Sequence, residues 1–142
     1  MLKIFLKSLV IIFIFLSTSF AEMVKKLEVT GNKRITSQSI SVLGEISLNQ
    51  DYNDAKLNSV LKKLYSTNFF KNINLSIENS IMKIDVIENP IIENIKITGI
   101  KNKNLLKSIN DQMTLKDRMS YTEDQFSRDL NLIKNIFKSS GF

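Results

Sequence analysis

Paired carboxylates offer the main catalytic chemistry that the residue types of this 142-residue chain allow. The chain contains no cysteine and no histidine, which excludes thiol nucleophiles, histidine general bases and the usual zinc sites. The closest acidic pairs, Asp51/Asp54 and Glu123/Asp124, could in principle serve a two-carboxylate hydrolase. Both pairs stand at the starts of predicted helices, where acidic side chains interact favourably with the helix dipole. Because the sequence also has no Gly-rich phosphate loop and no metal-spaced cluster, we expect neither an enzyme nor a cofactor.

Three short basic clusters, Lys33-Arg34, Lys62-Lys63 and Lys101-x-Lys103, contribute to a formal net charge of +6. Nucleic-acid binding would need them on one surface, with exposed aromatic side chains beside them. Most of the phenylalanines instead occupy apolar positions of predicted elements. The clusters are therefore interpreted as solvated corners and helix faces, and we expect no nucleic-acid partner.

The N-terminus has the pattern of an export signal. Two lysines precede a short apolar run, Leu9–Leu16, and small residues follow it up to Ala21. An uncleaved membrane anchor is the alternative, but the apolar run is far shorter than the ~20 residues needed to cross a bilayer. We expect a signal peptide, residues 1–21, with cleavage between Ala21 and Glu22.

One stretch of the chain occurs twice. Val24–Ile40 matches Ile92–Ile109 at a spacing of 68 residues, so that Thr30-Gly31 recurs as Thr98-Gly99. Each copy has a short alternating segment, a Thr-Gly pair, a basic corner and a run with helical spacing. A repeat of this kind predicts two copies of one structural module.

The first copy is predicted to contain a strand, two helices and a β-hairpin. In chain order these are Lys25–Thr30, Ser37–Ile46, a helix capped by Asn53 that runs to about Thr67, Lys71–Glu78 and Ile81–Glu88. Asn68 is placed to end the second helix in a left-handed conformation, and Asn79-Ser80 forms the hairpin turn. The fold class is therefore α+β: a β-α-α-β-β module whose three-stranded mixed sheet is covered on one face by two helices.

The second copy predicts a strand at Ile92–Thr98, a helix around Leu105–Ile109 and a second helix starting at Thr122. The inward stripe expected for this last helix is Phe126, Leu130, Ile133, Ile136 and Phe137. The chain ends where the second hairpin is expected, so we interpret it as part of a longer protein. With Pro90 as the junction, the expected domains are the signal peptide, a first module at 22–90 and an incomplete second module at 91–142.

Several motifs in this order resemble the POTRA domains of the BamA family of outer-membrane assembly factors. They are Val29-x-Gly31-Asn32-x-Arg34-Ile35, Leu57…Leu61…Leu64-Tyr65-x-Thr67-x-Phe69-Phe70, Val86-x-Glu88-x-Pro90, Ile97-x-Gly99-x-Lys101 and Gly141-Phe142. The resemblance covers the whole mature chain. The sequence departs from the pattern at Asn68, where a Gly is usual, and at Ile100, where the first copy has Asn32.

The resemblance implies tandem POTRA modules on the periplasmic side of a bacterial outer membrane. Its expected partners are unfolded outer-membrane proteins, accessory assembly lipoproteins, and the outer membrane itself through a C-terminal barrel that this sequence does not include. Three alternatives remain open: a cell-division protein of the FtsQ type, a two-partner secretion protein, and a stand-alone periplasmic binding protein.

Binding of an extended peptide is the chemistry that the predicted sheet supports. An outer strand has unpaired main-chain groups that can add a strand from a partner, with little dependence on the partner's sequence. We expect this edge at the first strand of the hairpin, Lys71, Asn72, Ile73, Asn74, Leu75, Ser76, Ile77 and Glu78.

Overall fold

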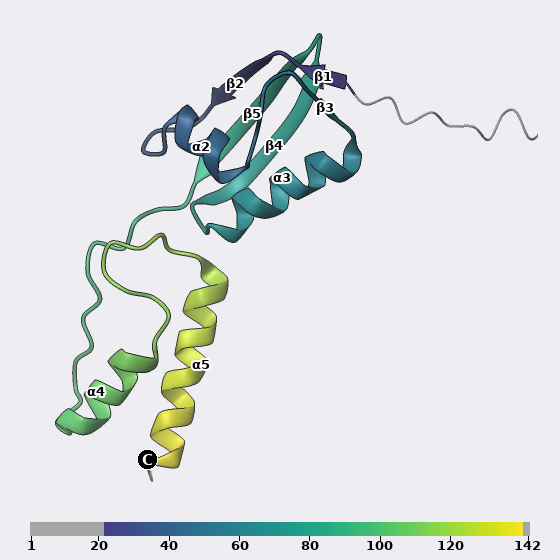
Figure 1. The fold of residues 1–142 in the computed structure, drawn as a ribbon. Helices are drawn as coiled ribbons and strands as arrows, with labels where there is room; N and C mark the ends of the chain where they lie inside the picture. Colours follow the sequence, from purple (N-terminus) through teal and green to yellow (C-terminus); the bar gives the residue numbers. More distant parts are fainter. Residues whose placement is uncertain (1–21, 141–142) are drawn as a thin grey trace, which may run out of the picture.

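The computed structural model describes residues 22–140. The predicted signal peptide with its cleavage position after Ala21, and the closing Gly141-Phe142, lie outside the described residues. The elements are, in chain order, β1 (Glu22–Val24), β2 (Lys26–Thr30), α2 (Ser37–Leu43), β3 (Gln50–Tyr52), α3 (Asp54–Ser66), β4 (Phe70–Glu78), β5 (Ile81–Glu88), α4 (Lys103–Gln112) and α5 (Glu123–Ser139). Figure 1 shows an N-terminal part with the sheet and a C-terminal part with α4 and α5.

The main sheet has the strand order β2-β5-β4, with β2 parallel and β4 antiparallel to the central strand β5. The mixed three-stranded sheet predicted from the sequence is therefore confirmed. Asn79 and Ser80 both have positive φ, 53° and 63°, which is the geometry of a type I′ hairpin turn. This turn fixes the register of the hairpin, in which Glu78 pairs with Ile81.

Both helices of the N-terminal part begin at polar caps. The Thr36 side chain accepts a hydrogen bond from Ser39 N–H at the start of α2, and Asn53 accepts one from Lys56 N–H at the start of α3. Asn68, with φ of 59°, follows α3 in the left-handed conformation predicted for it.

The prediction that the first helix runs to Ile46 is wrong, because α2 ends at Leu43. Glu45 has a positive φ of 51° and its N–H donates to the carbonyl of Val42, while Ile46 N–H donates to the carbonyl of Ser41. These two hydrogen bonds form a Schellman motif, which terminates the helix and turns Ile46 back into the core.

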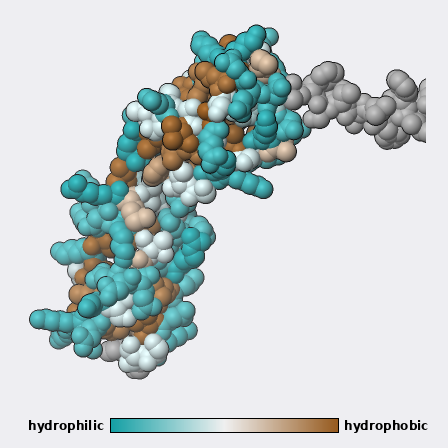
Figure 2. Space-filling view, in the orientation of Figure 1, coloured by the Kyte–Doolittle hydropathy of each residue, from teal (hydrophilic) through white to brown (hydrophobic). Residues whose placement is uncertain are grey.

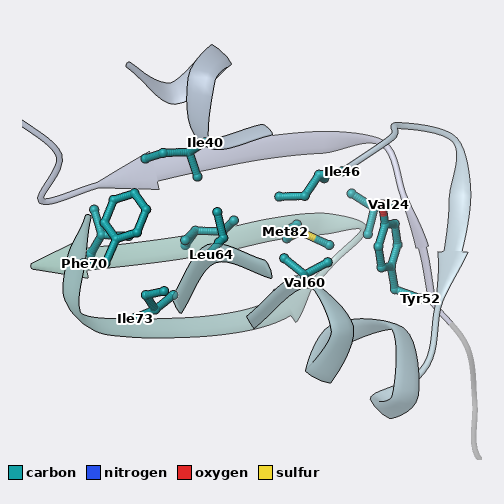
Figure 3. Packing of buried hydrophobic residues seen from close by; sticks show 11 residues of the cluster. Val24, Ile40, Ile46, Tyr52, Val60, Leu64, Phe70, Ile73 and Met82 are labelled. Carbon is teal, nitrogen blue, oxygen red and sulfur yellow. The ribbon is translucent and has the colours of Figure 1, made fainter. Parts of the chain in front are cut away.

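The core of the N-terminal part lies between the sheet and its two helices (Figure 3). The side chains that are essentially inaccessible to solvent come from α2, α3, β5 and the end of β1: Ile40, Leu64, Met82, Ile84, Val86 and Val24. Burying one such side chain contributes roughly 1.5–3 kcal/mol. The strand predicted at Ile81–Glu88 is confirmed as β5, and its even-numbered residues from Met82 to Val86 are the buried ones.

A second, two-stranded sheet was not predicted. In it β1 pairs antiparallel with β3, and Glu22 is aligned with Tyr52. Each strand has only three residues, too few for an alternating pattern to be visible in the sequence.

The C-terminal part repeats this pairing at the predicted spacing. An isolated bridge joins Ile91 to Ser120, and Arg118 N–H donates to the carbonyl of Ile92 at 2.8 Å. In the N-terminal part the corresponding bond runs from Asn49 N–H to the carbonyl of Val24 at 2.7 Å. Asn49 and Arg118 also share a positive φ, 60° and 65°. The repeat seen in the sequence is therefore also a repeat of backbone geometry.

The predicted strand at Ile92–Thr98 is wrong, because this segment has no strand structure. A strand requires a hydrogen-bonding neighbour. In the N-terminal part β5 is that neighbour for β2, and the residues that the structure describes include no counterpart of the β4–β5 hairpin beside 92–98.

The helices α4 and α5 form around a separate apolar cluster that includes Leu105, Ile109 and Met113. Thr122 caps α5, as the sequence predicts. The predicted inward stripe of α5 is only partly correct, because Phe126 and Leu130 are 39% and 40% exposed. None of the helices within residues 22–140 combines the length and apolar character needed to cross a bilayer.

Candidate functional site

Strand β4 is one of the two outer strands of the main sheet (Figure 1). All eight residues of the predicted binding edge lie in it, and β4 begins one residue earlier, at Phe70. The other outer strand, β2, has five residues against nine in β4. β4 is therefore the longer of the two edges.

The register shows which backbone groups of β4 point away from the sheet. In a two-residue hairpin, the two residues that flank the turn exchange backbone hydrogen bonds, and here they are Glu78 and Ile81. Along an antiparallel pair, every second residue exchanges backbone hydrogen bonds with its partner in the same way. Asn74 and the other even-numbered residues thus bond to β5. The N–H and C=O groups of Ile73, Leu75 and Ile77 consequently point outward.

A hydrogen bond from α3 supports this assignment independently. The N–H of Ile73 donates to the Tyr65 hydroxyl at 3.0 Å, which is possible only if that N–H points away from β5. Within residues 22–140, no hydrogen bond outside the strand ladder involves the N–H groups of Leu75 and Ile77. Sequence reasoning missed the role of Tyr65, which the helical periodicity places with the core residues of α3.

From Asn72 to Asn74 the side chains of β4 differ in burial between the two faces of the sheet. Ile73 is 7% exposed, and Leu75 and Ile77 pack partly against the core. Asn72 and Asn74 are exposed. Figure 2 shows that hydrophilic side chains cover much of the visible surface of both parts, with apolar patches between them.

Ion pairs keep the open face of the sheet polar. Lys26 Nζ lies 2.8 Å from Glu28 Oε1, and Lys83 Nζ lies 2.6 Å from Glu78 Oε2. The hydrogen bond from Lys26 lowers the pKa of Glu28, and the hydrogen bond to Glu78 raises the pKa of Lys83. Exposed pairs of this kind add little stability, but they make the face unfavourable for apolar association.

Glu88, at the end of β5, holds the basic corner that follows β2. Its Oε1 accepts hydrogen bonds from the backbone N–H groups of Lys33, Arg34 and Ile35, each at 2.9 Å. Burial raises the pKa of the Glu88 carboxyl, but these three donors and the Arg34 guanidinium outweigh burial, so the pKa lies below its ordinary value. The Arg34 guanidinium also lies over the Phe69 ring, 5.9 Å from its centroid.

The three basic clusters lie on separate segments. One follows β2, one is in the last turns of α3, and one is at the start of α4. Arg34 is bound to Glu88, and Lys63 pairs with Glu45 at 2.5 Å. Two of the three clusters thus each contribute one residue to a local ion pair, and the three lie on different elements.

The candidate carboxylate pairs also have local roles. Asp54 lies in the first turn of α3, while Glu123 and Asp124 lie in the first turn of α5. Asp51 belongs to β3, so the expectation that it starts a helix is wrong. In the described part of the chain, no three acidic side chains gather closely enough to hold a metal ion.

Asp129 is a buried acid that sequence reasoning missed. Its side chain lies in α5 at 3% exposure and accepts hydrogen bonds from the N–H groups of Thr114 and Leu115, at 2.9 and 2.8 Å. These bonds tie the loop after α4 to α5. The apolar periodicity of the helix could not predict its burial, because this pattern assigns acidic residues to the solvent-exposed face.

Comparison with curated proteins finds two similar assembly factors. The chain is 27% identical over 129 residues to the outer membrane protein assembly factor BamA of Neorickettsia risticii (strain Illinois). It is 27% identical over 78 residues to the BamA of Neisseria meningitidis serogroup B (strain MC58). These matches cover 89% and 55% of this chain but only 17% and 10% of the relatives. No protein-family model matches the chain.

Comparison with solved structures identifies the fold. The POTRA1-3 segment of the periplasmic domain of Omp85 from Anabaena superposes with a TM-score of 0.56 and 11% identity, covering 86% of this chain and 52% of that one. The N-terminal domain of Omp85 from Thermosynechococcus elongatus gives a TM-score of 0.55 at 12% identity, covering 82% and 51% of the two chains. The POTRA resemblance is therefore confirmed: this chain has the POTRA fold, and its sequence is similar to the outer membrane protein assembly factor BamA.

Proposed function

We propose that the chain is the periplasmic arm of an outer-membrane assembly factor and that it binds unfolded outer-membrane proteins. Its proposed organisation is a signal peptide at 1–21, a first POTRA module at 22–90 and a second POTRA module at 91–142. The proposed activity is binding alone, with no catalytic step. The names of the similar proteins support the assembly role, and the open edge of β4 supports the binding.

The observation that carries the proposal is the row of outward backbone groups on β4. Strand addition uses main-chain hydrogen bonds, so it accepts clients of many sequences. Transmembrane strands of outer-membrane proteins alternate apolar and polar residues. Such a segment, added beside Leu75 and Ile77, would continue the apolar face of the sheet on one side and its polar face on the other.

Proline at Leu75 tests this directly. Proline removes the outward N–H of residue 75 and leaves the ladder to β5 intact, because an edge strand tolerates proline where its N–H faces solvent. Leu75→Ala is the matched control, since it removes the same side chain and keeps the N–H. The probe is a labelled ten-residue peptide with alternating apolar and polar residues, and its affinity is measured by fluorescence anisotropy.

We expect Leu75→Pro to weaken peptide binding by about tenfold relative to Leu75→Ala, which corresponds to about 1.4 kcal/mol. Ile77→Pro and Ile77→Ala give a second, independent pair. Circular dichroism shows whether each variant is folded. Equal affinity of the proline and alanine variants at both positions would exclude β4 as the binding edge.

We further propose that the chain reaches the periplasm through its signal peptide and works with accessory assembly lipoproteins at the outer membrane. Intact mass of the protein from envelope fractions tests export, because cleavage after Ala21 gives a product beginning at Glu22. A product that retains residues 1–21 would contradict the cleavage and favour an anchored protein.

A further inference from the structure

Tyr65 connects the last turn of α3 to the edge of β4. Its hydroxyl accepts the hydrogen bond from Ile73 N–H at 3.0 Å and donates to Asn72 Oδ1 at 3.4 Å. The residue is 41% exposed, so its burial alone does not account for its position. One side chain from a helix thus occupies a backbone donor of the outer strand.

The donor that Tyr65 occupies is the first outward-pointing one of the regular strand. The register of β4 against β5 shifts between Phe70 and Asn72, which leaves Lys71 as an extra residue. A bulge of this kind twists an edge away from incoming strands. Regular pairing starts at Asn72, and Ile73 is the next residue.

We propose that Tyr65 caps this end of the β4 edge and thereby sets where a client strand can pair. The proposal rests on the proposed function of β4 as a binding edge. With Ile73 N–H occupied, the free outward groups are the C=O of Ile73 and both groups of Leu75 and of Ile77. A client strand is therefore confined to the half of β4 next to the hairpin turn.

The cap also keeps the client away from the junction between the two parts. A pocket of about 430 Å³ lies there, lined by residues that include Phe70, Pro90 and Tyr121. Phe70 and Lys71 are the β4 residues of this pocket, and both precede the capped position. Tyr65 thus separates the binding half of the edge from the junction, and only a short stretch of a client strand can pair with β4.

Tyr65→Phe tests the proposal because it removes the hydroxyl and keeps the ring. Tyr121→Phe is the matched control, since its hydroxyl donates to Glu123 and, within residues 22–140, makes no hydrogen bond to β4. Amide hydrogen exchange by NMR reports each outward N–H, in the free protein and with the alternating ten-residue peptide. Peptide affinity is measured on the same samples.

In the free protein, Tyr65→Phe should speed exchange at Ile73 about fivefold, while Tyr121→Phe leaves it unchanged. In the wild type, peptide should protect Leu75 and Ile77 but not add protection at Ile73. In Tyr65→Phe, peptide should also protect Ile73 and bind about three- to tenfold more tightly, because one more hydrogen bond forms.

Two results would overturn the proposal that Tyr65 caps the β4 edge. The first is that peptide protects Leu75 and Ile77 in the wild type, while Tyr65→Phe changes neither the peptide affinity nor the protection of Ile73. The other is exchange at Ile73 that is equally slow in both free proteins. Absence of peptide binding by the wild type and by Tyr65→Phe would refute the proposed function of the edge, and the inference with it.

Discussion

The carbonyl oxygen of Val86 in β5 lies against Gly31, 2.1 Å from where a Cβ atom on Gly31 would stand. Gly31 has a φ of 76°, so two separate constraints require glycine there. Gly99 occupies the same place in the second copy, with a φ of 86°, but apart from its two chain neighbours no residue in the described part of the chain has an atom within 4 Å of its Cβ position. The two glycines therefore share a backbone conformation and differ in what packs against them.

This difference predicts unequal costs for the same substitution. Gly99→Ala should cost about 1 kcal/mol from the left-handed backbone alone. Gly31→Ala should cost at least about 3 kcal/mol, because the clash is with a backbone carbonyl that cannot rotate away. Urea unfolding followed by circular dichroism measures both. Equal losses would mean that β5 does not hold Gly31 as described.

Glu88 should make stability depend on pH. Its pKa in the folded protein lies below the ordinary value of 4.5, so its charged form stabilises the fold above that pH. This contribution disappears as the pH falls through the folded-state pKa. Glu88→Gln should therefore cost about 1–2 kcal/mol at pH 7, and its difference from wild type should shrink below pH 4.5.

Urea titrations at pH 7 and pH 3.5 check this prediction. Glu45→Gln is the control, because Glu45 forms an exposed pair with Lys63 and its side chain accepts no backbone hydrogen bond from residues 22–140. A Glu88→Gln difference that stays constant across this pH range would show that the carboxylate charge is not what stabilises the corner.

Asp129 should hold the loop after α4. Asp129→Asn replaces one carboxylate oxygen by an amide NH₂, which leaves either Thr114 N–H or Leu115 N–H facing a donor. We expect a loss of about 1–3 kcal/mol in the C-terminal part. Asp124→Asn, at an exposed pair with Arg128, should change stability little. The measurement is amide exchange at Thr114 and Leu115, which Asp129→Asn alone should accelerate.

Asn68 should accept glycine but not alanine. Its φ of 59° costs a β-carbon side chain about 1 kcal/mol, which asparagine partly offsets. The backbone carbonyl of Asn68, which accepts from the Asn89 side chain, is unchanged by either substitution. We expect Asn68→Gly to be neutral or slightly stabilising and Asn68→Ala to be less stable. Identical melting temperatures for the two variants would contradict this.

The elements predicted correctly are those whose signals are local. Alternation in Ile81–Glu88, the caps Asn53 and Thr122, and the left-handed Asn68 all depend on a few neighbouring residues. The candidate binding edge, β4, is correctly predicted as a strand; a hairpin implies that one of its two strands is an outer one, and the strand order β2-β5-β4 shows that it is β4.

The errors have a common physical origin in tertiary contacts. Ile92–Thr98 alternates like a strand but has no neighbour to pair with in the described residues. Asp129 is buried because a distant loop offers two N–H groups. Tyr65 fits the apolar periodicity of α3, but periodicity carries no information about where a hydroxyl points.

The junction at Pro90 bears on how the chain carries mechanical load. Asn89 N–H donates to the carbonyl of Phe69, and the carbonyl of the next residue, Pro90, accepts a hydrogen bond from Tyr121 N–H. The backbone hydrogen bonds of the two parts therefore involve adjacent residues of the chain. Tension from the C-terminal part therefore reaches β5 directly. Because β5 runs parallel to β2, pulling β5 at its end and β2 at its start loads their five aligned pairs in shear. All the backbone hydrogen bonds between β2 and β5 would have to break together, which makes the N-terminal part resistant to unfolding under tension.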